Sequence, residues 1–177
     1  MKIIRIVLLL CELFATVALG SQQPPYPKLA FSLSRSEIKG EFHVALRNTR
    51  SAPIHVLLGY GDGSGHDGLD SVSFRLTSAN GKVFEMVPIG FPIIGIIRIL
   101  NAVIPPHQEW TADLSLKDFM GDERGKPLIN PMLVDMLPAG DYQLQAVFKG
   151  ERISWPPRTL LYWTGTLLSN SIDYKVP

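Results

Sequence analysis

Short runs in which apolar and polar residues alternate recur along most of this chain, and they limit its fold more than any other feature. A period of two places one face of a strand in a core and the other toward solvent. The runs are separated by turn residues such as Lys39-Gly40 and Asn80-Gly81, and no long stretch shows helical periodicity. Asn-Gly is the strongest short hairpin signal because both of its residues tolerate positive φ. The expected strands are 29–33, 42–46, 54–60, 72–76, 82–87, 110–116, 142–148 and 172–176. We therefore predict an all-β fold, an antiparallel sandwich of about seven to nine strands.

The first twenty residues have the layout of a secretory signal peptide. Lys2 and Arg5 form a short positive region, residues 6–17 form an apolar core, and residues 18–20 place small side chains at the cleavage positions. The apolar run is too short and too interrupted for a membrane anchor, which needs about 20 apolar residues. We predict that residues 1–20 are removed and that the protein is secreted or periplasmic.

The remaining sequence divides into a short leader and one domain. Residues 21–28 are polar and rich in proline, and the alternating runs occupy residues 29–177. The only cysteine, Cys11, lies in the predicted signal peptide, so the mature chain is expected to contain none. A secreted domain without disulfides depends on its hydrophobic core for stability.

The charge balance argues against two classes of partner. The chain has 17 Lys and Arg against 16 Asp and Glu, a formal net charge of +1, and the basic residues are scattered. Nucleic-acid binding needs a basic excess that neutralises phosphates. We predict no nucleic-acid partner, no polybasic membrane patch, and no transmembrane segment after signal removal.

The glycine-rich segment 59–68 is the first place to look for a metal site. Asp62, Ser64, Asp67 and Asp70 carry oxygen atoms that could surround a calcium ion. The positions at which an EF-hand loop needs glycine and glutamate hold other residues, however. We predict a solvated loop and no metal site, with these four residues as weak calcium candidates.

No arrangement typical of catalysis stands out. Ser64 lies between two glycines, but Asp62 occupies the place of the first glycine of a nucleophile elbow. The histidines show no metal-ligand spacing: His43, His55, His66 and His107. We predict no enzymatic activity, no catalytic residues and no cofactor.

The segment 88–104 is unusually apolar, yet proline, glycine, arginine and asparagine residues interrupt it, so a membrane span is implausible. Three structures are possible: a buried strand preceded by a loop, an exposed flap that binds a partner or lipid, or a short helix on the sandwich. In an exposed flap, Phe91, Ile94 and Ile97 are the candidate contact residues.

Two tryptophans are further candidates for partner binding. Trp155 precedes two prolines and is expected in a loop, whereas Trp163 is expected in the core or at a strand edge. Exposed tryptophan and tyrosine side chains could stack on sugar rings, which is the basis of a carbohydrate-binding alternative.

Two segments resemble a known class of proteins. Residues 137–144 (LPAGDYQL) are similar to the start of a late strand in immunoglobulin-like domains. Residues 163–170 (WTGTLLSN) resemble the closing segment of uncharacterised bacterial exported proteins with such domains. The resemblance implies an immunoglobulin-like β-sandwich, with Asn48 at a strand end and an apolar insertion near 88–104. It implies no activity.

Physical reasoning adds two expectations for the C-terminal part. The Tyr142 hydroxyl can bond to backbone at a sandwich corner, as in a tyrosine corner. Asn170 is expected to cap a turn through side-chain hydrogen bonds.

These observations favour a secreted or periplasmic binding domain without enzymatic activity. Its loops, at 59–68, 88–104 and 151–158, would contact an unknown protein or surface polymer, because loops on a rigid sandwich can vary without unfolding it. A protease inhibitor that presents one loop to a protease cleft is one alternative, and a carbohydrate-binding module is the other.

Overall fold

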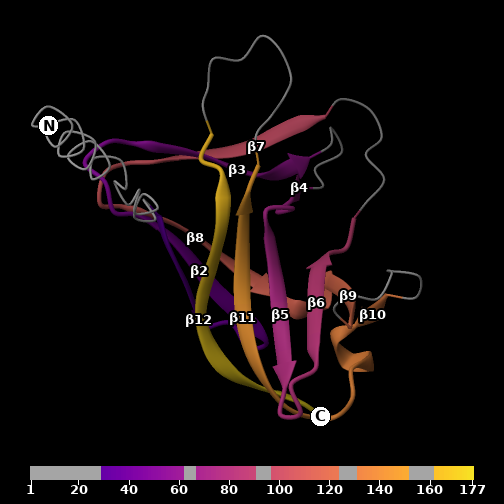
Figure 1. The fold of residues 1–177 in the computed structure, drawn as a ribbon. Helices are drawn as coiled ribbons and strands as arrows, with labels where there is room; N and C mark the ends of the chain where they lie inside the picture. Colours follow the sequence, from indigo (N-terminus) through magenta and orange to yellow (C-terminus); the bar gives the residue numbers. More distant parts are fainter. Residues whose placement is uncertain (1–28, 62–66, 91–96, 124–130, 152–161) are drawn as a thin grey trace, which may run out of the picture.

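The computed structural model describes residues 29–61, 67–90, 97–123, 131–151 and 162–177 (Figure 1). The predicted signal peptide and leader, residues 1–28, lie outside them. The elements below all come from this described part of the chain.

The fold is all-β and every strand pairing is antiparallel, as the alternating pattern predicts. The described residues contain twelve strands rather than seven to nine, and two of these have only two residues each. The strands are β1 (Leu29–Arg35), β2 (Glu41–Asn48), β3 (Ile54–Gly61), β4 (Asp67–Gly68), β5 (Val72–Ser78), β6 (Val83–Pro88), β7 (Arg98–Ile104), β8 (Glu109–Ser115), β9 (Phe119–Glu123), β10 (Met132–Leu133), β11 (Gly140–Gly150) and β12 (Gly165–Val176). Two short 3₁₀ turns, η1 (Leu116–Asp118) and η2 (Val134–Met136), flank β9 and β10.

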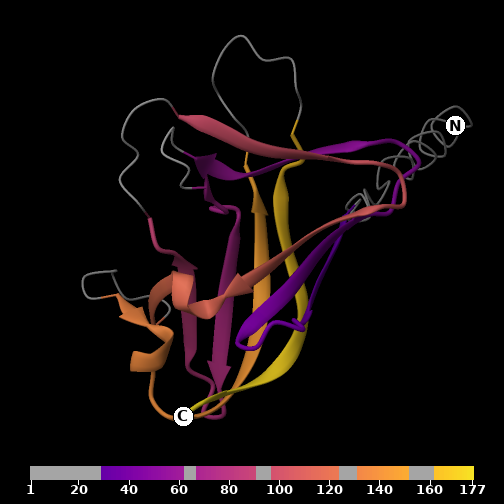
Figure 2. The same ribbon diagram turned by 180° about the vertical axis from the view of Figure 1, so that it is seen from behind.

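The strands form three sheets, in the orders β1-β2-β8, β10-β9-β6-β5-β11-β12 and β4-β3-β7. β1, β2 and β8 lie behind the six-stranded sheet in Figure 1 and in front of it in Figure 2, and β3 and β7 cross the upper end of that sheet. β3 follows β2 along the chain, and β8 follows β7, so the β3–β7 pair continues the β2–β8 pair. They therefore form one two-stranded ribbon that turns from one sheet into another.

The core lies between β1-β2-β8 and the six-stranded sheet, and aromatic rings fill it. Phe31 of β1 contacts Phe148 of β11 with ring centroids 5.9 Å apart, and Phe42 of β2 lies 6.3 Å from Phe74 of β5. All four rings are buried. Removing a buried ring of this kind costs about 3–5 kcal/mol, so these contacts hold the two layers together.

Asn48 fixes the corner at which the ribbon turns. Its buried side-chain Nδ2 lies 2.8 Å from the Ala52 carbonyl, 2.9 Å from that of Ile104 and 3.1 Å from that of Pro105. Its Oδ1 accepts the N–H of Arg50 at 2.8 Å. The expected position of Asn48 at a strand end is confirmed, and its amide satisfies main-chain groups that leave the ladders there.

The expected tyrosine corner is present. The Tyr142 hydroxyl donates a 2.7 Å hydrogen bond to the carbonyl of Pro138, four residues upstream. The ring is buried and packs edge-on against Phe84. This contact fixes the start of β11, which lies between β5 and the edge strand β12.

The expectation for Asn170 is wrong, because this residue lies inside β12 and joins two sheets. A β-bulge places Ser169 and Asn170 opposite Ala146, and the Ser169 hydroxyl accepts the Ala146 N–H. The Asn170 side chain then accepts the N–H of Leu33 at 3.0 Å and donates to the Leu33 carbonyl at 2.9 Å. Its amide thus acts as a strand partner for β1, at the edge where the two layers meet.

The apolar segment 88–104 is a framework strand in its second half rather than an insertion. Residues 98–104 form β7, which pairs with β3 and rules out a helix there. Within β7, Ile104 is fully buried and Leu100 and Ala102 are partly buried, whereas Val103 is 50% exposed. The reason is the position of β7 at the edge of the β4-β3-β7 sheet.

The Asn80-Gly81 hairpin is present, but its turn differs from the expected one. Only Gly81 has a positive φ, of 82°, whereas Asn80 does not. The Gly81 N–H bonds to the Ser78 carbonyl, and the Ser78 N–H bonds to that of Lys82. These features are typical of a three-residue loop that ends in a left-handed glycine.

Candidate functional site

The strand ends that flank three of the expected loops lie at one end of the molecule. We call this the upper end and define it by Gly61 of β3, Arg98 of β7, Gly150 of β11 and Gly165 of β12 (Figures 1 and 2). The chain leaves the described residues from this end after β3 and after β11, and returns to it before β7 and β12. The upper end is therefore the candidate site that corresponds to the predicted loops.

Both ends of the glycine-rich segment 59–68 belong to strands. β3 continues to Gly61, and β4 pairs with it through Tyr60–Gly68 and Gly61–Asp67. A Cβ atom on Gly59 would lie 1.9 Å from the Gly68 carbonyl oxygen, so only glycine allows this approach of the two chains.

Of the four weak calcium candidates, the structure describes Asp70 and the backbone of Asp67. Asp67 belongs to β4, and Asp70 Oδ2 accepts the N–H of Tyr60 at 3.1 Å. Asp62 and Ser64 lie outside the described residues. Within that described part, no three His, Cys, Asp or Glu side chains gather as a metal site.

Trp163 is a packing residue at the upper end. Its N–H donates to the His55 carbonyl of β3 at 2.8 Å, and its ring lies 5.9 Å from Phe148. A Cβ on Gly150 would lie 2.5 Å from Cε3 of this ring. Trp163 therefore ties β11 and β12 to β3, in agreement with its expected place at the core or a strand edge.

The other partner-binding candidates divide between the described and undescribed parts. Ile97 precedes β7 and is 41% exposed. Phe91, Ile94 and Trp155 lie outside the described residues. Among the described candidates, Ile97 therefore contributes exposed apolar surface at the upper end.

Tyr60 lies in an acidic environment at the same end. Partial burial raises the pKa of its phenol, and the carboxylates of Glu151 and Asp70 raise it further. Lys149 forms a 3.2 Å ion pair with Glu151 and offsets part of this negative charge. A phenol is protonated near neutral pH, so the Tyr60 hydroxyl can donate a hydrogen bond to a ligand.

A second candidate site lies at the opposite end, and sequence reasoning missed it. We call it the base groove, a cavity of about 670 Å³ formed by β5, β11, β12 and the end of β1. An adjoining cavity of about 290 Å³ extends along the β5–β6 hairpin. The residues that line the base groove are Arg35, Thr77, Ser78, Ala79, Asp141, Tyr142, Gln143, Asp173, Tyr174 and Lys175.

Hydrogen bonds hold the walls of the base groove in place. Gln143 Nε2 donates to Asp173 Oδ1, and the Arg35 guanidinium donates to the Asp173 carbonyl at 2.9 Å. The half-buried Tyr174 packs edge-on against Phe42 at 5.8 Å. Burial raises the pKa of the Tyr174 phenol, and the Asp135 carboxylate adds to this effect.

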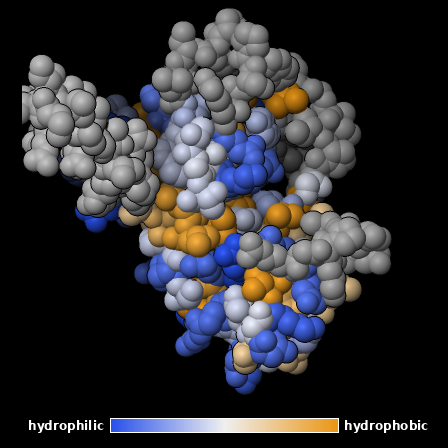
Figure 3. Space-filling view, viewed as in Figure 1, coloured by the Kyte–Doolittle hydropathy of each residue, from blue (hydrophilic) through white to orange (hydrophobic). Residues whose placement is uncertain are grey.

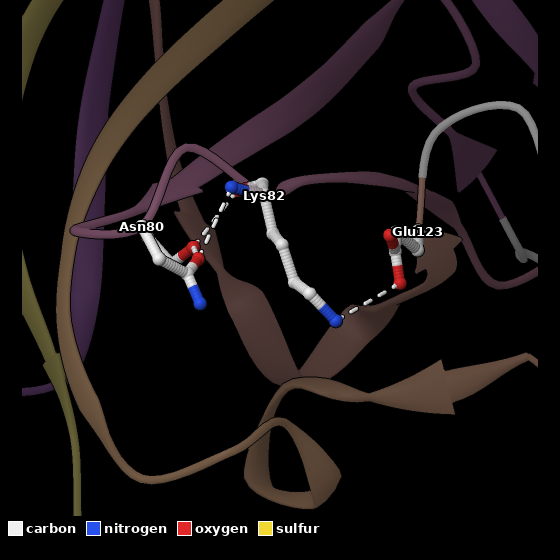
Figure 4. Close-up of polar contacts among 4 residues, drawn as sticks. Asn80, Lys82 and Glu123 are labelled. Carbon is white, nitrogen blue, oxygen red and sulfur yellow. Dashed lines mark hydrogen bonds and ion pairs between the residues drawn. The ribbon is translucent and has the colours of Figure 1, made fainter.

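Figure 4 shows how the hairpin beside the groove is braced. Asn80 Oδ1 accepts the Ser78 hydroxyl at 2.6 Å and the Lys82 N–H at 3.3 Å. Lys82 Nζ also reaches Glu123 of β9 at 3.6 Å. The hairpin is therefore a fixed wall of the adjoining cavity.

The alternating pattern contained only part of the signal for this groove. The alternation correctly predicts that the side chains of Gln143 and Asp173 point away from the core. The groove also depends on which strands are neighbours, because Thr77, Gln143 and Asp173 come together only in the β5–β11–β12 register. A sequence of period-two runs does not specify that order.

Comparison with known proteins adds no relative. No family model, no curated protein and no solved structure matches this chain. In the described part of the chain, no helix is long and apolar enough to cross a membrane.

Proposed function

We propose that this chain is an exported, immunoglobulin-like binding domain without enzymatic activity, which contacts a protein or surface polymer through its upper end. The observation that carries the proposal is the grouping of the strand ends of β3, β7, β11 and β12 at that end (Figure 1). Segments that leave a rigid framework from one end can form a common contact surface.

The framework at the upper end supports this role. Main-chain contacts at Gly59 and the packing of Trp163 on Gly150 hold the strand ends together. Ile97 provides exposed apolar area, and Tyr60 provides a protonated hydroxyl beside Glu151 and Asp70. Apolar and polar groups side by side are typical of protein contact surfaces.

Two observations support the immunoglobulin-like and exported parts of the proposal. The Tyr142–Pro138 hydrogen bond has the form of a tyrosine corner, which is a hallmark of immunoglobulin-like domains. The positive and apolar segments of residues 1–20 have the layout of a signal peptide.

Site-specific photo-crosslinking tests the upper end with a matched control. Ile97 and Ile38 are both exposed isoleucines, 41% and 54%, but Ile38 lies in the β1–β2 turn, away from the upper end. Each is replaced by p-benzoylphenylalanine in the cells that export the protein. We expect a discrete crosslinked product from position 97 and none from position 38. Equal products from both positions, or none from position 97, contradict the proposal.

A further inference from the structure

The base groove has the chemical character of a binding site for an uncharged polar ligand. Arg35 and Lys175 balance Asp141 and Asp173, so its lining has no net charge from these groups. A phosphate site would need a cationic excess, and a divalent cation would need an anionic one. Figure 3 shows that the lower third of this face of the six-stranded sheet is mainly hydrophilic, which also argues against a lipid.

One row of side chains crosses the groove at regular intervals. Thr77 is paired with Gln143, and Gln143 with Asp173, on three neighbouring strands. Adjacent strands lie about 4.8 Å apart, which is close to the length of one pyranose ring. The Gln143 amide and the Asp173 carboxylate are hydrogen-bonded to each other, and each keeps an oxygen atom that can accept from a sugar hydroxyl, one strand away from the Thr77 hydroxyl.

A second pair of polar groups lies beside this row and is available to a ligand. Asp141 and Lys175 are direct partners in the β11–β12 register. Within the described residues, neither side chain makes a hydrogen bond or ion pair. A carboxylate accepts hydrogen bonds from sugar hydroxyls and an ammonium group donates to their oxygens.

We propose that the base groove binds a neutral oligosaccharide through the hydroxyl groups of its pyranose rings. Its volume of about 670 Å³ is in the usual range for ligand sites, and the adjoining cavity of about 290 Å³ lengthens it along the hairpin. The Gln143–Asp173 and Ser78–Asn80 hydrogen bonds fix the walls before a ligand arrives. Less side-chain entropy is then lost on binding. This site is separate from the upper end and does not depend on the function proposed for it.

An NMR titration tests this site. The ¹⁵N-labelled protein, purified after expression of the full chain, is titrated separately with maltotriose, cellotriose, N,N′,N″-triacetylchitotriose and inorganic phosphate. We expect saturable shifts of the Thr77, Gln143 and Asp173 amides with at least one trisaccharide. The proposal is overturned if phosphate is the only ligand that causes shifts, or if none of the three trisaccharides causes saturable shifts.

Two glutamines of β11 provide a matched pair of variants. Gln143 lines the groove, whereas Gln145, two residues further along the strand, donates to the Ser169 carbonyl outside it. We expect Gln143→Ala to weaken trisaccharide binding at least about fivefold, which is the loss of one hydrogen bond, and Gln145→Ala to leave it unchanged. Asp141→Asn gives a second groove variant that keeps the size of the side chain. Equal affinities for the wild type and both groove variants contradict the site.

Discussion

The two ends of the molecule are held together by different kinds of contact. At the upper end, main chains approach so closely at Gly59 that an added Cβ would lie 1.9 Å from the Gly68 carbonyl oxygen. At the base, side chains make the connections, as in the Tyr142–Pro138 and Asn80–Ser78 hydrogen bonds.

This difference separates what can vary from what is fixed. The main-chain contact at the upper end requires glycine at position 59, because a Cβ there would lie 1.9 Å from the Gly68 carbonyl oxygen. The base depends on the identity of particular side chains, because each wall is fixed by a specific hydroxyl, amide or carboxylate. An adaptable contact surface suits the first arrangement and a defined small-ligand groove suits the second.

The largest expected effect comes from a methyl group at the upper end. Gly59→Ala must separate β3 from Gly68 and Asp70, and we expect a loss of about 3 kcal/mol in the free energy of unfolding. Gly81→Ala is the control at the base, where the new methyl group has open space but φ is +82°. We expect about 1 kcal/mol for this left-handed position. If urea denaturation shows the same loss of unfolding free energy for Gly59→Ala and Gly81→Ala, the proposed difference between the two ends is wrong.

A smaller effect is expected at the seam between the layers. Asn170→Ala removes both hydrogen bonds to Leu33, and we expect a loss of about 2 kcal/mol. Hydrogen exchange of β1 should accelerate in this variant, while that of β5 changes less. Protection of β1 equal to that in the wild type would mean that core packing alone holds the strand.

A pair of tyrosines compares the two ends directly. Tyr142→Phe at the base loses the bond to the Pro138 carbonyl, and we expect a cost of about 1 kcal/mol. Tyr60→Phe at the upper end removes a hydroxyl whose proposed role is in binding, so thermal unfolding should change little. If Tyr60→Phe destabilises the protein more than Tyr142→Phe does, specific side-chain hydrogen bonds stabilise the upper end rather than the base, and the comparison is wrong.

The smallest effect concerns the side of the sandwich, where Asp113 of β8 faces His43 of β2 at 3.1 Å. Hydrogen bonds from Ser36 and then His43 lower the pKa of the Asp113 carboxyl. A lowered pKa stabilises the fold above the pKa of the unfolded chain, and this contribution is lost as pH falls through the folded pKa. Thermal melts between about pH 2 and pH 6 should therefore show wild type and Asp113→Asn converging at the acid end. A difference that grows toward acid pH would contradict the assignment.

Local signals in the sequence predicted the parts of the fold that depend on neighbouring residues. The alternation around Tyr142 and Phe74 predicted the strands and their buried faces, and the place of Tyr142 near the start of its strand predicted the corner. The Asn80-Gly81 hairpin followed from turn chemistry, although its loop has one more residue than expected.

The parts that were missed depend on strand order. Asn170 resembles a turn residue in sequence, and only the β12 bulge turns its amide toward Leu33. The base groove likewise requires β5, β11 and β12 to be neighbours. β7 is apolar enough to suggest burial, but its place at a sheet edge leaves Val103 exposed. In each case the deciding contact joins residues far apart along the chain.

The hydrogen bonds between Leu33 and Asn170 have a consequence for the time course of folding. They join residues 137 positions apart, so the outer edge of β1 obtains this partner only after nearly the whole chain is available. Non-local pairing of this kind slows folding. An unpaired strand edge can also join another chain in the interval. During synthesis, β1 is among the first strands made, and its outer edge is among the last to gain this hydrogen-bonding partner, so that edge is open to other chains for most of the time.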